Sequence, residues 1–221
     1  MATLLHIDTA TKVCSVALSR DGEQIALKEI KEDGYSHGEK LTLFIEDVMQ
    51  QAQLKMLDLD AVSLASGPGS YTGLRIGAAT AKGLCYALKI PLIAIDALTS
   101  LAFLAKKKHP NINLCPVIDA RRMEVYNLFL DSNLNALKEI SADIIDEESY
   151  SEFEPFVCFG DGASKLQEVW SGRNSTFDLE IESSASGQIE LAHLKFKNKS
   201  FEDVAYWEPF YLKDFIAGKK G

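Results

Sequence analysis

Short runs of apolar residues alternate with amphipathic stretches along the first half of the chain. Each run is bounded by turn-forming residues, a pattern that is typical of β-strands. We predict strands at residues 4–8, 14–19, 24–30, 61–66 and 91–95. Asp21 and Gly22 separate the second strand from the third, and an Asp-Gly pair between apolar runs predicts a tight hairpin.

Apolar residues also recur at three- and four-residue spacing, which predicts helices with one buried stripe. The first helix covers residues 41–52 and follows Ser36-His37-Gly38-Glu39, a capping box. A second helix covers residues 72–88, and a third runs from Leu98 to Ala105.

The same plan returns in weaker form after residue 113, which predicts a duplicated α/β fold. We predict strands at 114–119, 125–130 and 156–159, and helical segments at 164–170 and 188–196. A lysine-rich turn with Pro110 marks the boundary. It divides an N-terminal lobe at residues 1–106, which carries the first three helices, from a smaller acidic lobe at residues 107–221. The last segment of the chain is free to pack back on the first lobe.

The helix at residues 72–88 is apolar or small around most of its circumference. Its charges, Arg75 and Lys82, are seven residues apart and are followed by Lys89, so they form one narrow stripe. Such a helix has to be covered on more than one side. The sheet can cover one side, and the other needs either the second lobe or another protein. We predict another protein.

Composition and charge narrow the functional classes. A hydrophobic content of 47% and a charged content of 25% are ordinary for a globular protein, and no apolar run is long enough to span a membrane. Residues 1–110 carry 12 acidic and 12 basic side chains, whereas residues 111–221 carry 20 and 11, so the net charge of −9 lies in the second half. Nucleic-acid binding by this chain alone is therefore disfavoured. The scattered cysteines predict reduced thiols and a cytoplasmic location.

The glycine-rich segment GPGSYTGLRIG at residues 67–77 joins a strand to a helix. Gly67 and Gly69 could bring backbone amides close to a phosphate, or they could simply permit a tight, closely packed turn. The segment lacks the Lys-Ser/Thr pair of a Walker A loop and the spacing of a dinucleotide-binding fingerprint. Asp8 and Thr9 are further candidates for a phosphate site, but Ala10 stands where a phosphate turn favours glycine.

The sequence contains no recognisable catalytic or metal-binding motif. The four histidines form no recognisable ligand set, and no serine lies in a nucleophile elbow. We predict no catalytic residue, no metal site and no cofactor.

The glycine-rich segment, together with AKGL at residues 81–84, strongly resembles the TsaB (YeaZ) family. Further matches cover nearly the whole chain: IDT at 7–9, CSVAL at 14–18, His37, DAR at 119–121, EVY at 124–126, GDGA at 160–163 and PFYLK at 209–213. The chain departs from the family pattern at Arg122, where a smaller or apolar residue is common, and at Lys213, where arginine is usual. The resemblance implies two actin-like (ASKHA, RNase-H-like) lobes, the second reduced.

The resemblance also implies a role. TsaB-like proteins are non-catalytic subunits required for threonylcarbamoylation of N6 of adenosine 37 in tRNAs that read ANN codons. They dimerise with and activate the catalytic subunit TsaD through two N-lobe helices, and the ATPase TsaE joins them. Whether the chain forms a homodimer when it is alone stays open, and tRNA is reached through the complex. The partner-binding candidates are Leu41, Ile45, Val48, Arg75, Gly77, Ala78, Ala81 and Lys82.

A glutamate at Gly77 or Ala81 is expected to abolish the pairing with TsaD. Three other readings remain open at the level of sequence. The chain could be an ATPase or sugar kinase of the same fold, a metalloprotease of the glycoprotease type, or a homodimeric interaction protein without a role in tRNA modification.

Overall fold

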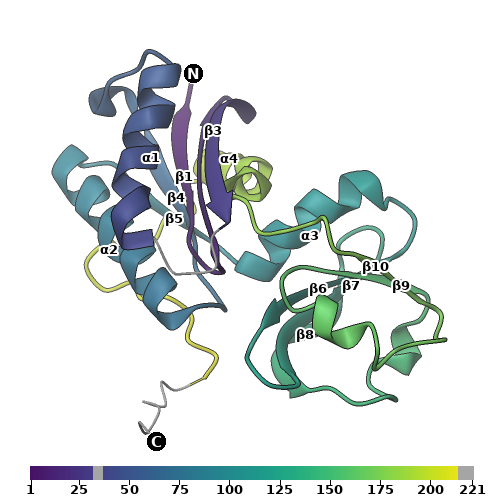
Figure 1. Cartoon of the computed structure of the whole chain (residues 1–221). Coiled ribbons are helices and arrows are strands. Elements are labelled where there is room, and N and C mark those ends of the chain that lie inside the picture. The colour runs from purple at the N-terminus through teal and green to yellow at the C-terminus, as the bar shows by residue number, and fades with distance from the viewer. Residues whose placement is uncertain (32–36, 214–221) are drawn as a thin grey trace, which may run out of the picture.

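A computed structural model describes residues 1–31 and 37–213 as two lobes, each built on a five-stranded mixed sheet (Figure 1). The first sheet has the order β3-β2-β1-β4-β5. Its strands are β1 (Thr3–Asp8), β2 (Val13–Arg20), β3 (Glu23–Lys31), β4 (Ala61–Ala65) and β5 (Leu92–Ile95). β1 pairs antiparallel with β2 and parallel with β4, and the predicted hairpin is confirmed. β1 lies at the centre, and every one of its residues is buried.

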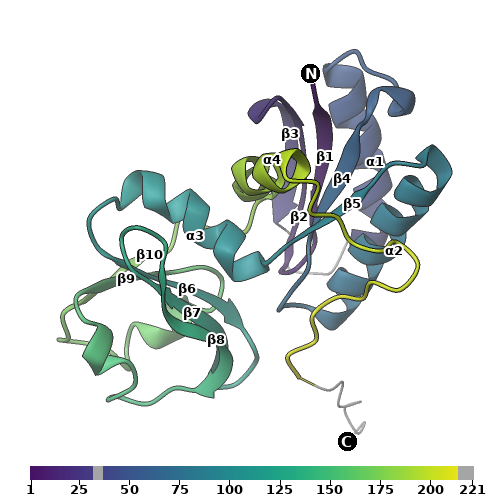
Figure 2. The same cartoon turned by 180° about the vertical axis from the view of Figure 1, so that it is seen from behind.

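Helices cover both faces of the first sheet. α1 (His37–Gln51) and α2 (Tyr71–Leu88) lie side by side on one face, and α4 (Ile189–Lys197) lies on the other (Figures 1 and 2). The apolar stripes of α1 and α2 form one core cluster with β1, β2 and β4. Ser36 of the predicted capping box lies outside the described residues.

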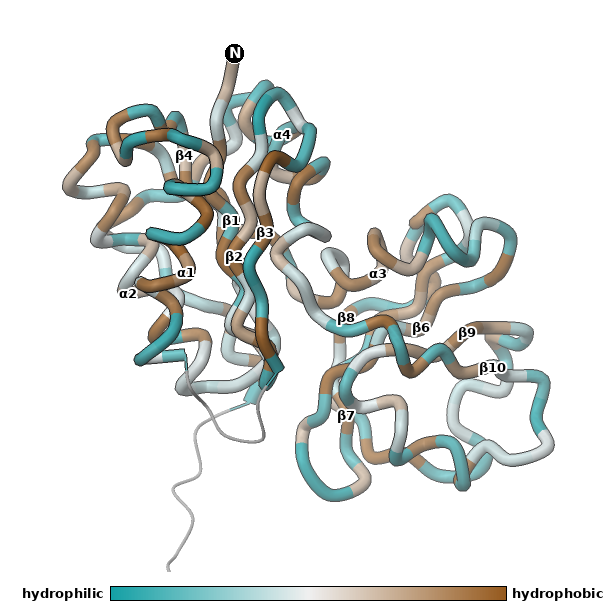
Figure 3. Tube along the Cα trace, turned by 45° about the horizontal axis from the view of Figure 1, so that its top comes forward, coloured by the Kyte–Doolittle hydropathy of each residue, from teal (hydrophilic) through white to brown (hydrophobic). Residues whose placement is uncertain are grey.

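The second sheet has the order β10-β9-β6-β7-β8. Its strands are β6 (Asn113–Asp119), β7 (Glu124–Leu130), β8 (Ala136–Ile144), β9 (Phe156–Phe159) and β10 (Ser175–Asp178). α3 (Ala97–Lys108) packs on one face, and an aromatic cluster around the buried Trp170 fills the other. Figure 3 shows hydrophobic and hydrophilic residues alternating along the trace of both lobes.

α3 lies between the two sheets. Its buried residues, such as Leu98 and Leu101, share one core cluster with Leu114 of the second sheet and with Ala65 and Leu74 of the first lobe. The lobe boundary after residue 106 therefore stays a prediction. The sequence does not predict β8 and β10, because their side chains are mostly half-exposed and show no clean alternation. Residues 164–170 form only the short 3-10 helix η3 (Ser164–Leu166) and turns.

After α4 the chain returns across the first lobe. Glu202 bridges to Leu92 at the edge of β5, and Trp207 packs against the core cluster of α1 and α2. The backbone amide of Phe210 then donates to the carbonyl oxygen of Ser66 at 2.8 Å. This C-terminal segment, residues 202–213, therefore lies against the first lobe and ends beside the second. No helix in the described part of the chain is long and apolar enough to cross a membrane.

Candidate functional site

The glycine-rich turn between β4 and α2 is packed against the chain itself. A Cβ atom on Gly69 would lie 2.3 Å from the carbonyl oxygen of Ala10, and one on Gly67 would lie 2.6 Å from that of Phe210. The amide of Ser70 donates to Ala10 at 2.6 Å, and the Ser70 hydroxyl accepts from Gly73 to cap α2. Of the two readings of this segment, the contacts favour the tight turn over a phosphate loop.

Asp8 and Thr9 also bind groups of the chain itself. Both are buried at the end of β1. One carboxylate oxygen of Asp8 accepts from the amide of Ala10 at 3.0 Å, and the hydroxyl of Thr9 donates to the carbonyl oxygen of Gly73 at 2.8 Å. His37 donates from its ring to the carbonyl oxygen of Thr11 at 2.9 Å. These hydrogen bonds connect the β1–β2 turn to the first turns of α1 and α2.

The pKa of the Asp8 carboxyl group is raised from 3.8 to about 6, chiefly by burial. The hydrogen bond from Ala10 lowers this pKa, and the charges of nearby Glu29 and Asp161 add to the rise. The folded chain thus holds this proton more tightly than the unfolded chain. The contribution of Asp8 to the free energy of unfolding is therefore complete below about pH 4 and is lost as the pH rises through about 6. At pH 7 the loss lowers the free energy of unfolding by on the order of 3 kcal/mol.

We therefore expect Asp8→Asn to remove this loss, because asparagine keeps the acceptor for Ala10 without the ionisation. The free energy of unfolding of the parent protein should fall relative to that of the variant between pH 4 and pH 7, by on the order of 3 kcal/mol. Urea denaturation at four pH values measures the difference. Parallel pH curves for the two proteins would contradict this account of Asp8.

Most of the predicted partner-binding residues lie inside the first lobe. The exposed fraction is 1% for Leu41, 3% for Ile45 and 0% for Val48, and these side chains pack in the core cluster beneath α1. On α2, Ala78 and Ala81 are buried in the same cluster. These residues face the sheet because the apolar stripe of each helix is the side that its own core covers. These side chains therefore offer little surface to a partner, and their part in partner binding stays a prediction.

The other three predicted partner-binding residues differ in burial and in contacts; they are Gly77, Lys82 and Arg75. Gly77 is buried, and a Cβ atom there would lie 2.4 Å from the hydroxyl oxygen of Thr9. The Lys82 amine donates to the carbonyl oxygens of Ala205 and Trp207, which anchors the C-terminal segment on α2. Arg75 alone among the predicted partner-binding residues is exposed. Its guanidinium lies 4.1 Å from the ring centre of Tyr71.

The opposite side of the same two helices is exposed, and we call it the outer helix face. It consists of Thr42, Leu43 and Glu46 of α1 and Arg75, Ala79, Gly83, Tyr86 and Ala87 of α2. Leu43 is 53% exposed and Tyr86 is 84% exposed. A Cβ atom on Gly83 would have no neighbour within 4 Å. The small residues at 79, 83 and 87 follow the helical repeat, which is the signal in the sequence that could have identified this face.

A cavity of about 550 Å³ opens between the lobes. Its walls come from the β1–β2 turn, the start of α2, the β6–β7 turn and the C-terminal segment, including residues 10–12, 69–72, 118–122 and 210–213. The elements that close the glycine-rich turn therefore also shape this space. Among residues 1–31 and 37–213, no group of three or more histidine, cysteine, aspartate and glutamate side chains is placed to hold a metal ion.

Comparison with known proteins identifies the family. A family model described as "TsaD: tRNA N6-adenosine threonylcarbamoyltransferase" matches residues 32–206. The chain belongs to this family. The sequence is 28% identical to the tRNA threonylcarbamoyladenosine biosynthesis protein TsaB of Haemophilus influenzae, covering 99% of this chain and 96% of that protein. It is 29% identical to the TsaB protein of Escherichia coli, with coverage of 98% and 97%.

Comparison with solved structures identifies the fold. YeaZ from Pseudomonas aeruginosa superposes with a TM-score of 0.81 at 24% identity, over 96% of this chain and all of that one. The fold is thus that of YeaZ, and the predicted two-lobed α/β class is confirmed. The resemblance to TsaB (YeaZ) proteins that the motifs predicted is confirmed as well.

Proposed function

We propose that this chain is a non-catalytic subunit in the formation of threonylcarbamoyladenosine in tRNA. It supports threonylcarbamoylation of N6 of adenosine 37 in tRNAs that read ANN codons, by dimerising with and activating a TsaD-like catalytic subunit. The observation that carries the proposal is the match over nearly the full length of both chains to proteins named for threonylcarbamoyladenosine biosynthesis.

The outer helix face supports dimerisation as the mode of action. Side chains at Ala79, Gly83 and Ala87 are small, so a helix from a partner can approach α2 closely, and the exposed ring of Tyr86 and side chain of Leu43 offer apolar area at its sides. Because the chain and a TsaD-like partner share one family, the partner is expected to present the equivalent pair of helices. The same face allows a homodimer when the chain is alone.

The closed β1–β2 turn supports the non-catalytic assignment. In this turn the Asp8 carboxylate accepts from the amide of Ala10, and the Thr9 hydroxyl donates to the carbonyl oxygen of Gly73. The backbone of Ala10 also packs against Gly69 of the glycine-rich turn. These groups are therefore not free to cradle the phosphates of a substrate. Transfer of the threonylcarbamoyl group is assigned to the TsaD-like subunit, with a TsaE-like ATPase as a further member of a cytoplasmic complex that also holds the tRNA.

Reconstitution tests the proposal. Purified TsaD-like and TsaE-like subunits, threonylcarbamoyl adenylate and an unmodified ANN-reading tRNA are combined with and without this chain, and modified adenosine is measured by mass spectrometry after nuclease digestion. We expect modification only when the chain is present, together with a complex of the chain and the TsaD-like subunit in size-exclusion chromatography. Modification by the chain alone, or equal modification without it, would refute the proposal.

A further inference from the structure

The two helices of the outer helix face expose opposite charges. On α1 the exposed charged residues are the acidic Glu39, Glu46 and Asp47, and the basic Lys40 is half-buried. α2 contains no acidic residue, and its Arg75 is exposed. One side of the face is therefore acidic and the other side is basic.

These charges are not neutralised within the chain. The side chains of Glu39 and Glu46 have no hydrogen bond or ion pair with any residue in the described ranges, 1–31 and 37–213. The guanidinium of Arg75 lies 4.1 Å from the ring centre of Tyr71 and 6.0 Å from that of Tyr211, but no carboxylate of the described residues pairs with it. A partner that supplies the opposite charge on each side therefore fits this face best.

The acidic and basic residues lie at matching heights along the two helices. α1 and α2 both start at the β1–β2 turn and run in the same direction (Figure 1). A Cβ atom on Gly38 would lie 3.9 Å from the side chain of Ile76, so these two residues are level with each other. Glu39 follows Gly38 and Arg75 precedes Ile76, so this acid and this base are level as well.

An exposed apolar side chain and a shallow gap on the face also lie level with each other. Leu43 is 53% exposed and comes five residues after Gly38. The same count from Ile76 reaches the part of α2 between the exposed Ala79 and Gly83, because both helices rise by about 1.5 Å per residue. A leucine at this height on one helix therefore fits between the two small residues of another copy of α2.

Two twofold arrangements can bring the outer helix faces of two copies together. A twofold axis perpendicular to the helices places α1 on α1 and α2 on α2, so that like charges meet. A twofold axis parallel to the helices places α1 of each copy on α2 of the other and keeps every residue at its own height. Only this second arrangement brings Glu39 opposite Arg75 of the second copy and Leu43 opposite its small residues.

We infer that two copies of this chain associate through the outer helix face, with α1 of each copy packed parallel to α2 of the other. Glu39 pairs with Arg75 of the second copy, and the twofold axis forms this pair twice. The proposed function assigns the same face to a TsaD-like subunit, so the homodimer hides that face and has to dissociate before the heterodimer forms. Only this last consequence rests on the proposed function.

Complementation between two single charge reversals tests the inference. In the homodimer, Glu39→Arg brings arginine against arginine, and Arg75→Glu brings glutamate against glutamate. Each variant alone should therefore self-associate at least about tenfold more weakly than the parent. In a mixed dimer of the two variants, every contact again joins an arginine and a glutamate, so an equimolar mixture should associate about as strongly as the parent. Sedimentation equilibrium of the full-length chain over a concentration series measures these constants.

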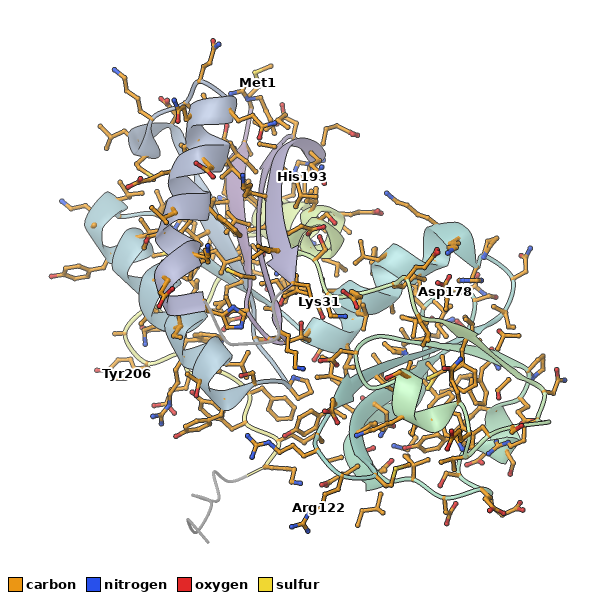
Figure 4. The ribbon with its side chains drawn as sticks, in the orientation of Figure 1. Met1, Lys31, Arg122, Asp178, His193 and Tyr206 are labelled. Carbon is orange, nitrogen blue, oxygen red and sulfur yellow. The ribbon has the colours of Figure 1, made fainter. Side chains whose placement is uncertain are left out.

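The matched control reverses the same two kinds of charge on α4, in the variants Glu190→Arg and Lys197→Glu. Both residues are exposed, and α4 lies on the other side of the first sheet, where Figure 4 labels His193. Each control variant should self-associate like the parent, and mixing the two should change nothing. A melting temperature within a few degrees of the parent's shows that a variant is folded.

Three results would each overturn the inference. The parent could stay monomeric throughout the concentration series, either single variant could self-associate like the parent, or the mixture could associate no better than its two components. In the last case the helices do not pack α1 on α2. None of these measurements involves a TsaD-like subunit, so their failure is distinguishable from a failure of the reconstitution assay.

Discussion

Replacing Gly83 with glutamate is expected to abolish binding to a TsaD-like subunit while the chain stays folded. Gly83 is exposed in the middle of α2, and an added side chain there meets nothing within 4 Å in the chain itself. On the outer helix face, however, it would stand between two closely packed helices and bury an unpaired charge. Such a charge costs about 3 kcal/mol or more, so the dissociation constant should rise at least about 100-fold.

Calorimetric titration with the TsaD-like subunit measures this change, and the reconstituted assay should lose modified adenosine in parallel. The matched control is Leu194→Glu, which adds the same charge at a half-exposed position of α4, on the opposite face of the sheet. The control should bind and function like the parent. If Gly83→Glu binds normally, the outer helix face is not the docking surface, and the proposed mode of dimerisation is wrong.

Replacing Gly77 with glutamate is expected to unfold the first lobe, which is a different outcome from the loss of pairing that the sequence predicted. The Cβ atom would lie 2.4 Å from the hydroxyl oxygen of Thr9 and 3.5 Å from Leu64, and the carboxylate would have no room to reach water. Overpacking and an unpaired buried charge together exceed about 4 kcal/mol, a large part of the stability of an ordinary domain.

Circular dichroism and thermal denaturation distinguish the two glycine variants. Gly77→Glu should be insoluble or should melt far below the parent, whereas Gly83→Glu should melt within a few degrees of it. A folded Gly77→Glu protein that fails only to bind the TsaD-like subunit would instead return Gly77 to the docking surface. The two variants, six residues apart on α2, thus distinguish a defect in the core from a defect in the docking surface.

The location of the glycines in the sequence did not reveal their different roles. Gly69, Gly73 and Gly77 each lie where a Cβ atom would approach Ala10 or Thr9 within 2.4 Å, whereas Gly83 has open space. Gly73 and Gly77 lie on α2, where the absence of a side chain lets the β1–β2 turn approach the helix closely. Which residue contacts each glycine depends on where the β1–β2 turn lies against α2. That contact joins residues far apart in the sequence, since Thr9 and Gly73 are 64 positions apart.

The local sequence pattern was sufficient to predict most helices and strands and to indicate the family. The periodicity of apolar residues predicted α1, α2, α4 and the buried strands of both sheets. The reason is that side chains buried on one face of a helix or strand recur in the sequence at the period of that element. The segment at residues 67–77 and the motifs along the rest of the chain indicated the TsaB resemblance, because a turn packed this tightly tolerates few other residues.

Tertiary structure alone decided which side of each helix is free and what the charged residues do. A helix with apolar or small residues on most sides has no single side that its sequence marks as outer, and the covering of α2 by the C-terminal segment comes from far along the chain. Lys82, for example, is anchored to a carbonyl group 123 residues away. Lys12 and Arg121 likewise line one cavity only because the fold brings the β1–β2 turn and the β6–β7 turn together, and residues so far apart in the sequence leave no local pattern.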